Sequence, residues 1–195
     1  MSNFDAVTTW ERTGEGRWSG QIPTSWMQGR AAFGGVVTGA AMRAMRAQVG
    51  DDRRARSLSA SFLAPVGSGE AQLEVRILRA GRSVTHAEAR ASQGGQERAV
   101  ILAAFGGDRD SAVSLKGAPR PERTPPEKLG SLPIIPGVIP DFVQHFDLRW
   151  TDGGVPFSGD ERNFLGGWCR HRGPATGPEA IIGLLDGWPA PVLPM

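Results

Sequence analysis

Asp186 is the carboxylate whose sequence surroundings are best suited to chemistry. It ends an apolar helical run and precedes Gly187-Trp188-Pro189. A carboxylate that faces an apolar crevice can hold or deprotonate a water molecule. The alternative is an aspartate that only starts the turn before the proline, and the local sequence alone favours that turn.

Gly34 and Gly35 form the second candidate site, because they open the clearest helical stretch of the chain. The first turn of a helix has free N–H groups, and glycine lets a ligand oxygen approach them closely. Such a site can polarise a carbonyl group and stabilise the oxyanion of acyl transfer. The alternative is tight packing of the glycines against a sheet, which the local sequence alone favours.

Other chemistries find little support in the motifs. The chain has no G-x-S-x-G, no G-x-x-x-x-G-K-[ST] and no G-x-G-x-x-G after a strand. His86, His145 and His171 lie far apart in the sequence, without a carboxylate spaced to complete a metal-ligand set. We therefore expect no metal site and no cofactor.

Cys169 and His171 suggest a thiolate pair, because both would lie on one face of a strand. Residues two apart on a strand are separated by about 6.6 Å along the backbone, at about 3.3 Å per residue. Direct hydrogen bonding between them is awkward at that spacing. We therefore interpret Cys169 and His171 as ordinary half-buried strand residues.

The elements that must position these residues follow from hydrophobic periodicity. A helix is predicted over 36–49, with small residues that allow close packing. Alternating apolar residues then predict four antiparallel strands, at 58–62, 73–77, 84–92 and 97–105. The Gly94-Gly95 pair predicts a tight hairpin. A helix packed on such a sheet gives an α+β fold.

The chain after residue 107 is organised differently. Residues 108–140 are rich in proline and lack periodicity, which predicts a linker. Strands are then expected at 142–150 and 166–172, and a helix at 178–185. We thus predict an N-terminal unit at 1–107, the linker at 108–140, and the start of a second unit at 141–195.

Composition excludes several classes of function. Hydrophobic residues make up 39% and charged residues 22% of the 195 residues, which is ordinary for a globular protein. A net charge of +2 without a basic stripe argues against nucleic-acid binding. No apolar run of membrane-spanning length, no signal-peptide pattern and a single cysteine are present. These features predict a cytoplasmic protein.

Several segments resemble the TesB-like acyl-CoA thioesterase II group, a family of double-hotdog thioesterases. The resemblance covers the chain from about Trp18 to Met195, and it rests on the order and spacing of short motifs. These are Gly29–Val37 (GRAAFGGVV), Arg56–Pro65 (RSLSASFLAP), Leu78–Thr85 (LRAGRSVT), Ala103–Gly106 (AAFG), Gly167–Arg170 (GWCR) and Leu184–Pro189 (LLDGWP).

The resemblance implies two hotdogs per chain, each a long helix wrapped by an antiparallel sheet. It also implies hydrolysis of an acyl-CoA thioester by an activated water, with no metal and no covalent intermediate. In the family a helix aspartate works with a threonine and a glutamine from later strands of the second hotdog. Asp186 matches the aspartate, and the other two positions would lie beyond Met195. The expected architecture is one complete hotdog and an incomplete second one.

The leading hypothesis is an acyl-CoA thioesterase in which Asp186 orients the attacking water and helix N-terminal amides polarise the thioester. The main alternative is a catalytically silent acyl-binding or scaffold protein. A hydratase acting on enoyl thioesters ranks last, because neither His86 nor His145 has a suitably spaced aspartate. The second helix must also bury its apolar face, against the first hotdog, a partner chain or further residues. We therefore expect a homo-oligomer.

Overall fold

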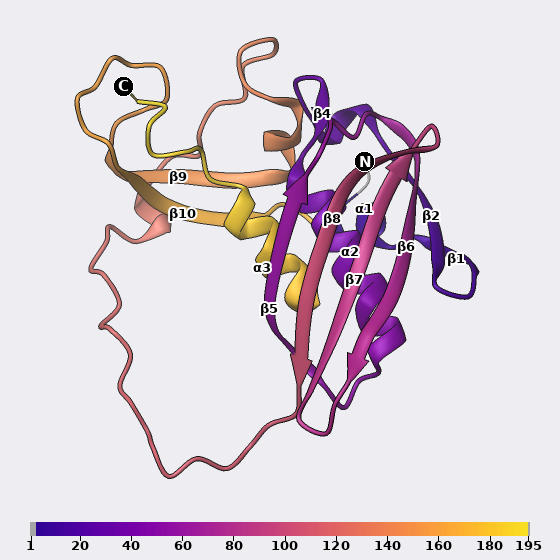
Figure 1. Cartoon of the computed structure of the whole chain (residues 1–195). Coiled ribbons are helices and arrows are strands. Elements are labelled where there is room, and N and C mark those ends of the chain that lie inside the picture. Colours follow the sequence, from indigo (N-terminus) through magenta and orange to yellow (C-terminus); the bar gives the residue numbers. More distant parts are fainter. Residues whose placement is uncertain (1–2, 195) are drawn as a thin grey trace.

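The computed structural model describes residues 3–194. The chain forms two parts, which are joined by a segment without helix or strand over residues 107–125 (Figure 1). The helices are α1 (Phe4–Thr8), α2 (Gly34–Val49) and α3 (Gly177–Asp186). The strands are β1 (Glu11–Gly14), β2 (Arg17–Ile22), β3 (Met27–Gln28), β4 (Ala31–Ala32), β5 (Arg54–Phe62), β6 (Gly69–Ala80), β7 (Val84–Gln93), β8 (Gln96–Gly106), β9 (Phe146–Gly153) and β10 (Leu165–His171).

The large sheet has the order β1-β2-β6-β7-β8-β5, and every neighbouring pair is antiparallel. The four predicted strands correspond to β5–β8. Val75, Ala89 and Ile101 lie opposite one another on adjacent strands, and all three are buried toward the helix. Gly94 and Gly95 have φ of 60° and 74°, so the β7–β8 hairpin uses the left-handed conformation that glycine tolerates.

Helix α2 packs against the inner face of this sheet (Figure 1). Both surfaces are built from small residues, with Gly39, Ala40 and Ala41 on the helix and Ala87 and Ala89 on β7. Small side chains on both sides let the helix lie close to the strands, and the surrounding larger residues fill the core. This long helix wrapped by an antiparallel sheet is a hotdog, so the expected α+β fold class is confirmed.

The N-terminal residues differ from the sequence expectation. The segment over 14–26, rich in glycine, serine and tryptophan, indicates a short strand followed by a loop, whereas β1 and β2 form a hairpin that extends the sheet. Helix α1 was not predicted, because five residues are too short to show a helical period. Asn3 caps it by accepting the Ala6 N–H, and a Cβ at Gly39 would lie 3.1 Å from the Phe4 ring.

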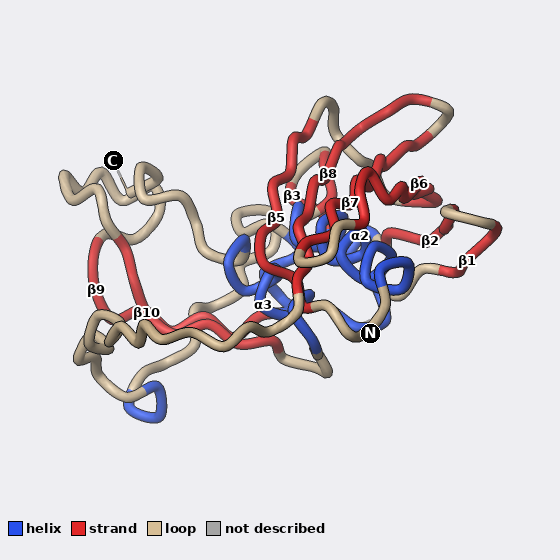
Figure 2. The backbone as a smooth tube through the Cα atoms, turned by 60° about the horizontal axis from the view of Figure 1, so that its bottom comes forward, coloured by secondary structure: helices blue, strands red, loops and turns tan. Residues whose placement is uncertain are grey.

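The second part of the chain forms a separate hairpin and a helix. Strands β9 and β10 pair antiparallel, and residues 142–145, predicted as the start of a strand, belong to a 3-10 helix over Asp141–His145 that precedes β9. Figure 2 shows this hairpin extending away from the large sheet, whereas α3 lies beside α2. The α3 residues Ile182 and Leu184 pack against the main core, while Ile181 and Leu185 are exposed.

Within residues 3–194, no helix is long and apolar enough to cross a membrane. The same residues contain no cluster of His, Cys, Asp and Glu that could hold a metal ion.

Candidate active site

The N-terminus of α2 lacks a local cap. Phe33 occupies the cap position, and its side chain makes no capping hydrogen bond. A residue far away in the sequence provides the acceptor instead, because the Gly35 N–H donates a hydrogen bond to Oδ2 of Asp186 over 2.7 Å. The structure thus brings together the candidate residues Gly35 and Asp186, which are 151 positions apart.

Two glycines make room for this contact. A Cβ built on Gly34 would lie 2.9 Å from Oδ2 of Asp186 and 3.1 Å from the Phe62 ring. A Cβ on Gly35 would lie 2.5 Å from the Phe33 ring and 3.2 Å from the Cα of Gly183 on α3. The absence of side chains at Gly34 and Gly35 therefore allows both the close packing of α3 on α2 and the approach of the Asp186 carboxylate to the helix amides.

Helix α3 delivers the carboxylate, because Asp186 is its last residue. Burial of the Asp186 carboxylate raises its pKa above the ordinary value of 3.8, and the hydrogen bond from Gly35 opposes that rise. A carboxylate with a raised pKa is a stronger base than an exposed one. Asp186 as a whole remains exposed to solvent, so its carboxylate is only partly desolvated at the end of α3.

One helix amide at the site remains available. The N–H of Val36 donates to the Phe33 carbonyl, and that of Gly35 is held by Asp186. The Gly34 N–H has no hydrogen-bond partner among residues 3–194. It lies at the positive end of α2, beside a half-exposed Phe62 ring, where it can donate to an incoming oxygen.

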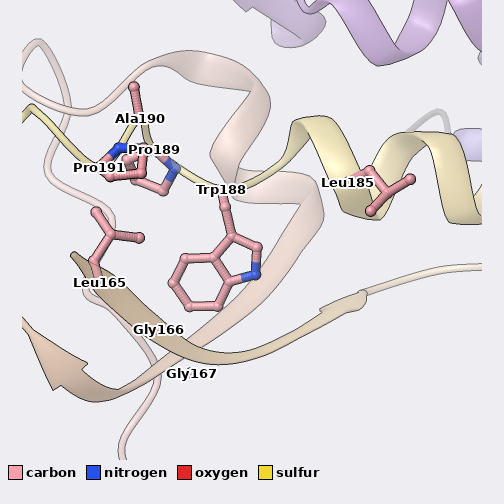
Figure 3. Close-up of a pocket in the computed structure, with 8 residues that line it drawn as sticks. All are labelled: Leu165, Gly166, Gly167, Leu185, Trp188, Pro189, Ala190 and Pro191. Carbon is pink, nitrogen blue, oxygen red and sulfur yellow. The ribbon is translucent and has the colours of Figure 1, made fainter. Parts of the chain in front are cut away.

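An apolar pocket of about 400 Å³ lies just past the C-terminal end of α3 (Figure 3). The Trp188 ring separates the helix end from β10, and a Cβ on Gly167 would lie 2.9 Å from that ring. Trp188 also packs edge-on against Trp150, with 5.1 Å between the ring centroids. The pocket is lined by Leu165, Gly166, Gly167, Leu185, Trp188, Pro189, Ala190 and Pro191.

The predicted absence of a thiolate pair agrees with the geometry of β10. Burial raises the pKa of the Cys169 thiol to about 12, with a contribution from the Asp147 charge. Such a thiol stays protonated and is a poor nucleophile. The Nε2 atom of His171 hydrogen-bonds the Ala180 carbonyl at 2.9 Å, and burial lowers its pKa.

The other two histidines, His145 and His86, make their contacts with residues other than Asp186. His145 stacks on Trp26 at 3.8 Å between centroids, and its Nε2 lies 3.0 Å from the Ser25 carbonyl oxygen. His86 is on β7, paired with Arg79 and Ala104 in the large sheet. Neither supplies a hydrogen bond to Asp186 among the described residues.

Two buried carboxylates were missed by sequence reasoning. Glu179 on α3 is fully buried and pairs with Arg46 of α2 over 3.0 Å. Asp147 on β9 is 3% exposed, and hydrogen bonds from Arg149, Ser131 and Arg170 hold its pKa far below the ordinary value. Alternating arginines around Asp147 were a visible signal, whereas nothing local marks Glu179 as buried.

Comparison with known proteins agrees with this geometry. Residues 22–106 match the family model described as the acyl-CoA thioesterase N-terminal domain. No curated protein matches the chain at a significant level.

Three solved structures have the same fold. A hot dog protein of unknown function from Alicyclobacillus acidocaldarius has a TM-score of 0.86 at 22% identity, over 98% of this chain and 71% of that one. A putative thioesterase II from Thermobifida fusca YX has a TM-score of 0.80 at 24% identity, over 98% and 74%. The acyl-CoA thioesterase II TesB2 from Mycobacterium marinum has a TM-score of 0.70 at 21% identity, over 94% and 66%.

The chain therefore spans about two thirds to three quarters of these proteins. The similarity to TesB-type acyl-CoA thioesterases that the motifs predict is confirmed by the match of residues 22–106 to the acyl-CoA thioesterase N-terminal domain model, and the solved structures show that the chain has a hotdog fold.

Proposed function

We propose that this protein hydrolyses acyl-CoA thioesters with a water molecule oriented by Asp186. The observation that carries the proposal is the Asp186 carboxylate at the N-terminus of α2, 2.7 Å from the Gly35 nitrogen and next to the Gly34 N–H, for which residues 3–194 provide no acceptor. A general base and an oxyanion donor must converge on one reacting carbon in this chemistry, and in the proposed site they would come from two helices.

The steps follow from these groups. One oxygen of Asp186 is held by Gly35, and the other accepts a hydrogen bond from water. As the water oxygen attacks the thioester carbon, its proton passes to the carboxylate and the carbonyl oxygen becomes an oxyanion. The Gly34 N–H and the positive end of α2 stabilise that charge. The carbon–sulfur bond then breaks, and the leaving thiolate takes the proton from Asp186.

The pocket beyond α3 supports binding of an apolar acyl group. Leu185 immediately precedes the candidate base and Trp188 follows it by two positions, so the pocket wall and the base share one short segment. Burial of acyl methylene groups against Trp188 and Leu165 would contribute binding free energy at about 0.8 kcal/mol per CH₂.

A second candidate, acyl-CoA binding without hydrolysis, is favoured by one specific observation. The bond from Gly35 to Asp186 is also what a purely structural helix cap requires. In that case Asp186 would stabilise α2 and carry out no proton transfer. The experiment below separates the two functions.

The test compares Asp186→Asn with the wild-type protein in release of free CoA from acyl-CoA substrates of increasing chain length. Asparagine keeps the acceptor for the Gly35 N–H and removes the base. We expect kcat to fall by about 10²–10⁴-fold with little change in KM, because general-base catalysis contributes about that much. Asp110→Asn, in an exposed segment, is the matched control. Binding without CoA release in the wild-type protein would instead establish the silent function.

The pH dependence gives an independent check. Asp186 must be ionised to act as a base, and burial raises its pKa. Activity should therefore fall as the solution is acidified, with a midpoint above that of an exposed aspartate. A rate that stays constant down to pH values near 3.8, the ordinary pKa, would contradict the role of Asp186 as base.

We also propose a homo-oligomer in the cytoplasm, with the unit boundaries predicted from the sequence. Exposed apolar side chains at Phe62 of β5 and at Ile181 and Leu185 of α3 support self-association. Sedimentation equilibrium would test it, and a monomer at all concentrations would contradict it.

A further inference from the structure

A partly buried ion pair joins α2 and α3 at the end opposite to the candidate active site. Nη1 of Arg46 lies 3.0 and 3.2 Å from the two carboxylate oxygens of Glu179. The Glu179 side chain is fully buried and that of Arg46 is 35% exposed. The Glu179 carboxylate loses its hydration in this pair, whereas Arg46 keeps part of its own, so burying the carboxylate is a costly way to stabilise a helix contact.

Gly177 shapes the space around this pair. Its φ is +71°, and a Cβ built on it would lie 2.3 Å from Oε2 of Glu179 and 3.1 Å from Nη1 of Arg46. A side chain at this position would displace the carboxylate. The first turn of α3 is therefore fitted closely around the ion pair.

The two helices run in opposite directions, with one polar contact at each end. Gly35 at the start of α2 meets Asp186 at the end of α3, and Arg46 near the end of α2 meets Glu179 near the start of α3. Glu179 and Asp186 are seven residues apart, or about 10 Å along the helix at 1.5 Å per residue. Fixing Glu179 therefore fixes the axial position of Asp186.

Between these two polar contacts, the packing of α3 on α2 restrains the axial register of α3 only weakly. Gly35 and Gly183 face each other across the helix pair, where a Cβ on Gly35 would lie 3.2 Å from Gly183 Cα. Glycines allow close approach, but they offer no side chains that interlock. Ile181 and Leu185 on the outer face are exposed and add no restraint. Ile182 and Leu184 pack against the core, but such apolar contacts are non-directional.

Other polar contacts of α3 restrain it differently. The N–H of Thr176, before the helix, donates to Asp5 over 3.0 Å in an exposed hydrogen bond. The Ala180 carbonyl is bonded by His171 of β10. Neither contact joins α3 directly to α2, on which the Gly35 amide lies.

We propose that Arg46 and Glu179 are positioning residues that fix the axial register of α3 on α2 and so hold the Asp186 carboxylate at the Gly35 N–H. The catalytic consequence rests on the proposed function, but the positioning itself is observable without any reaction. Buried ion pairs are best known for specifying such registers rather than for adding stability.

The test uses two replacements of different severity. Glu179→Gln removes one charge and leaves Arg46 without its partner, so this variant is the more prone to unfold. Arg46→Met combined with Glu179→Met replaces both partners by apolar side chains of similar length, which commonly preserves stability. The matched control is Arg76→Met with Glu74→Met, which removes an exposed ion pair of the large sheet.

Two readouts are measured on each folded variant. The first is hydrogen exchange and the ¹H–¹⁵N chemical shift of the Gly35 amide, which report its bond to Asp186. The second is kcat and KM for acyl-CoA hydrolysis. In the Met–Met variant we expect faster exchange at Gly35, and a kcat lowered by about 10- to 100-fold with KM nearly unchanged. The control should change neither.

The outcomes separate the two proposals. A folded Met–Met variant with wild-type Gly35 exchange and wild-type kcat overturns the positioning role. Loss of Gly35 protection in a protein that hydrolyses no thioester supports the positioning role and overturns the proposed function. A drop in kcat with unchanged Gly35 exchange also overturns positioning, because the pair would then act by another route.

Discussion

Helices α2 and α3 differ sharply in how deeply the protein embeds them. Every residue of α2 from Gly35 to Met42 is buried, beneath the large sheet on one side and α1 and α3 on the other. In α3 only Glu179 and Gly183 are buried. The candidate base, Asp186, thus lies on α3, the less buried helix, whereas the amides near it belong to the buried helix α2.

Because of this difference, the N-terminal part carries most of the stability of the chain, whereas the C-terminal part carries the candidate base. The N-terminal part holds most of the buried apolar side chains, and unfolding it would expose the core. The C-terminal part contributes ion pairs of the buried carboxylates Glu179 and Asp147, whose desolvation costs free energy. Substitutions in the two parts should therefore have different kinds of effect.

The largest effect on stability is expected from Phe105→Ala in β8. Phe105 is fully buried, and deleting such a ring leaves a cavity that costs about 3–5 kcal/mol of the free energy of unfolding. Urea denaturation followed by circular dichroism measures this loss. Leu102→Ala on the same strand, where the side chain is half exposed, is the control and should cost much less. Equal losses at the two sites would contradict the assigned core.

A smaller loss is expected from Asp147→Asn in β9. The arginines around Asp147 remain partly exposed, so the cost should be about 2 kcal/mol, below the 3–5 kcal/mol of a fully buried pair. The folded-state pKa is depressed, so this stabilisation is present above the unfolded pKa and disappears as the pH falls through the folded value. The variant should therefore lose less stability on acidification than the wild-type protein, in acid titrations of both.

Asp186→Asn should change stability in the opposite direction. Burial raises the folded-state pKa of Asp186, so its contribution to stability is present at low pH and is lost as the pH rises through that value. Asparagine removes the partly desolvated charge, and we expect a small gain of stability at pH 7. Parallel urea titrations at pH 7 and near pH 4 should show the gain only at the higher pH.

The smallest effect is expected from Leu185→Ala. This side chain is 77% exposed, so the free energy of unfolding of the monomer should change by no more than about 0.5 kcal/mol. Ile182→Ala, one turn away on the packed face, should cost more. A large loss at Leu185 would show that its face is covered in solution, and sedimentation at several concentrations would identify self-association.

The first part of the fold could be predicted well because its signals are local. Alternation in β6 and β7, the Gly94-Gly95 turn and the small-residue helix each depend on neighbours within a few positions. Helix α1 was missed because its five residues show no helical period, and Gly39, against which Phe4 packs, lies far along the chain. Residues 142–145 were assigned to a strand because a 3-10 turn with buried Phe142 and Val143 has no period to distinguish it.

The candidate site could be predicted only as separate pieces. The sequence indicated Asp186, Gly34 and Gly35, but local patterns favoured a turn and a packing contact. The contact between Asp186 and Gly35 depends on the docking of α3, a tertiary relation that no spacing encodes. Glu179 was missed for the same reason, since an acidic residue in the first turn of a helix is usually explained by the helix dipole.

The segment over 107–125 has no helix or strand, and it arcs away from the body in Figure 1 while joining the two parts that carry the candidate site. A covalent tether of this kind converts the meeting of α3 with α2 into an intramolecular event, at an effective concentration on the order of millimolar. The base and the amides would then meet at a frequency independent of protein concentration. Cutting this segment would turn the same contacts into a binding equilibrium between two fragments, and dilution would then separate them.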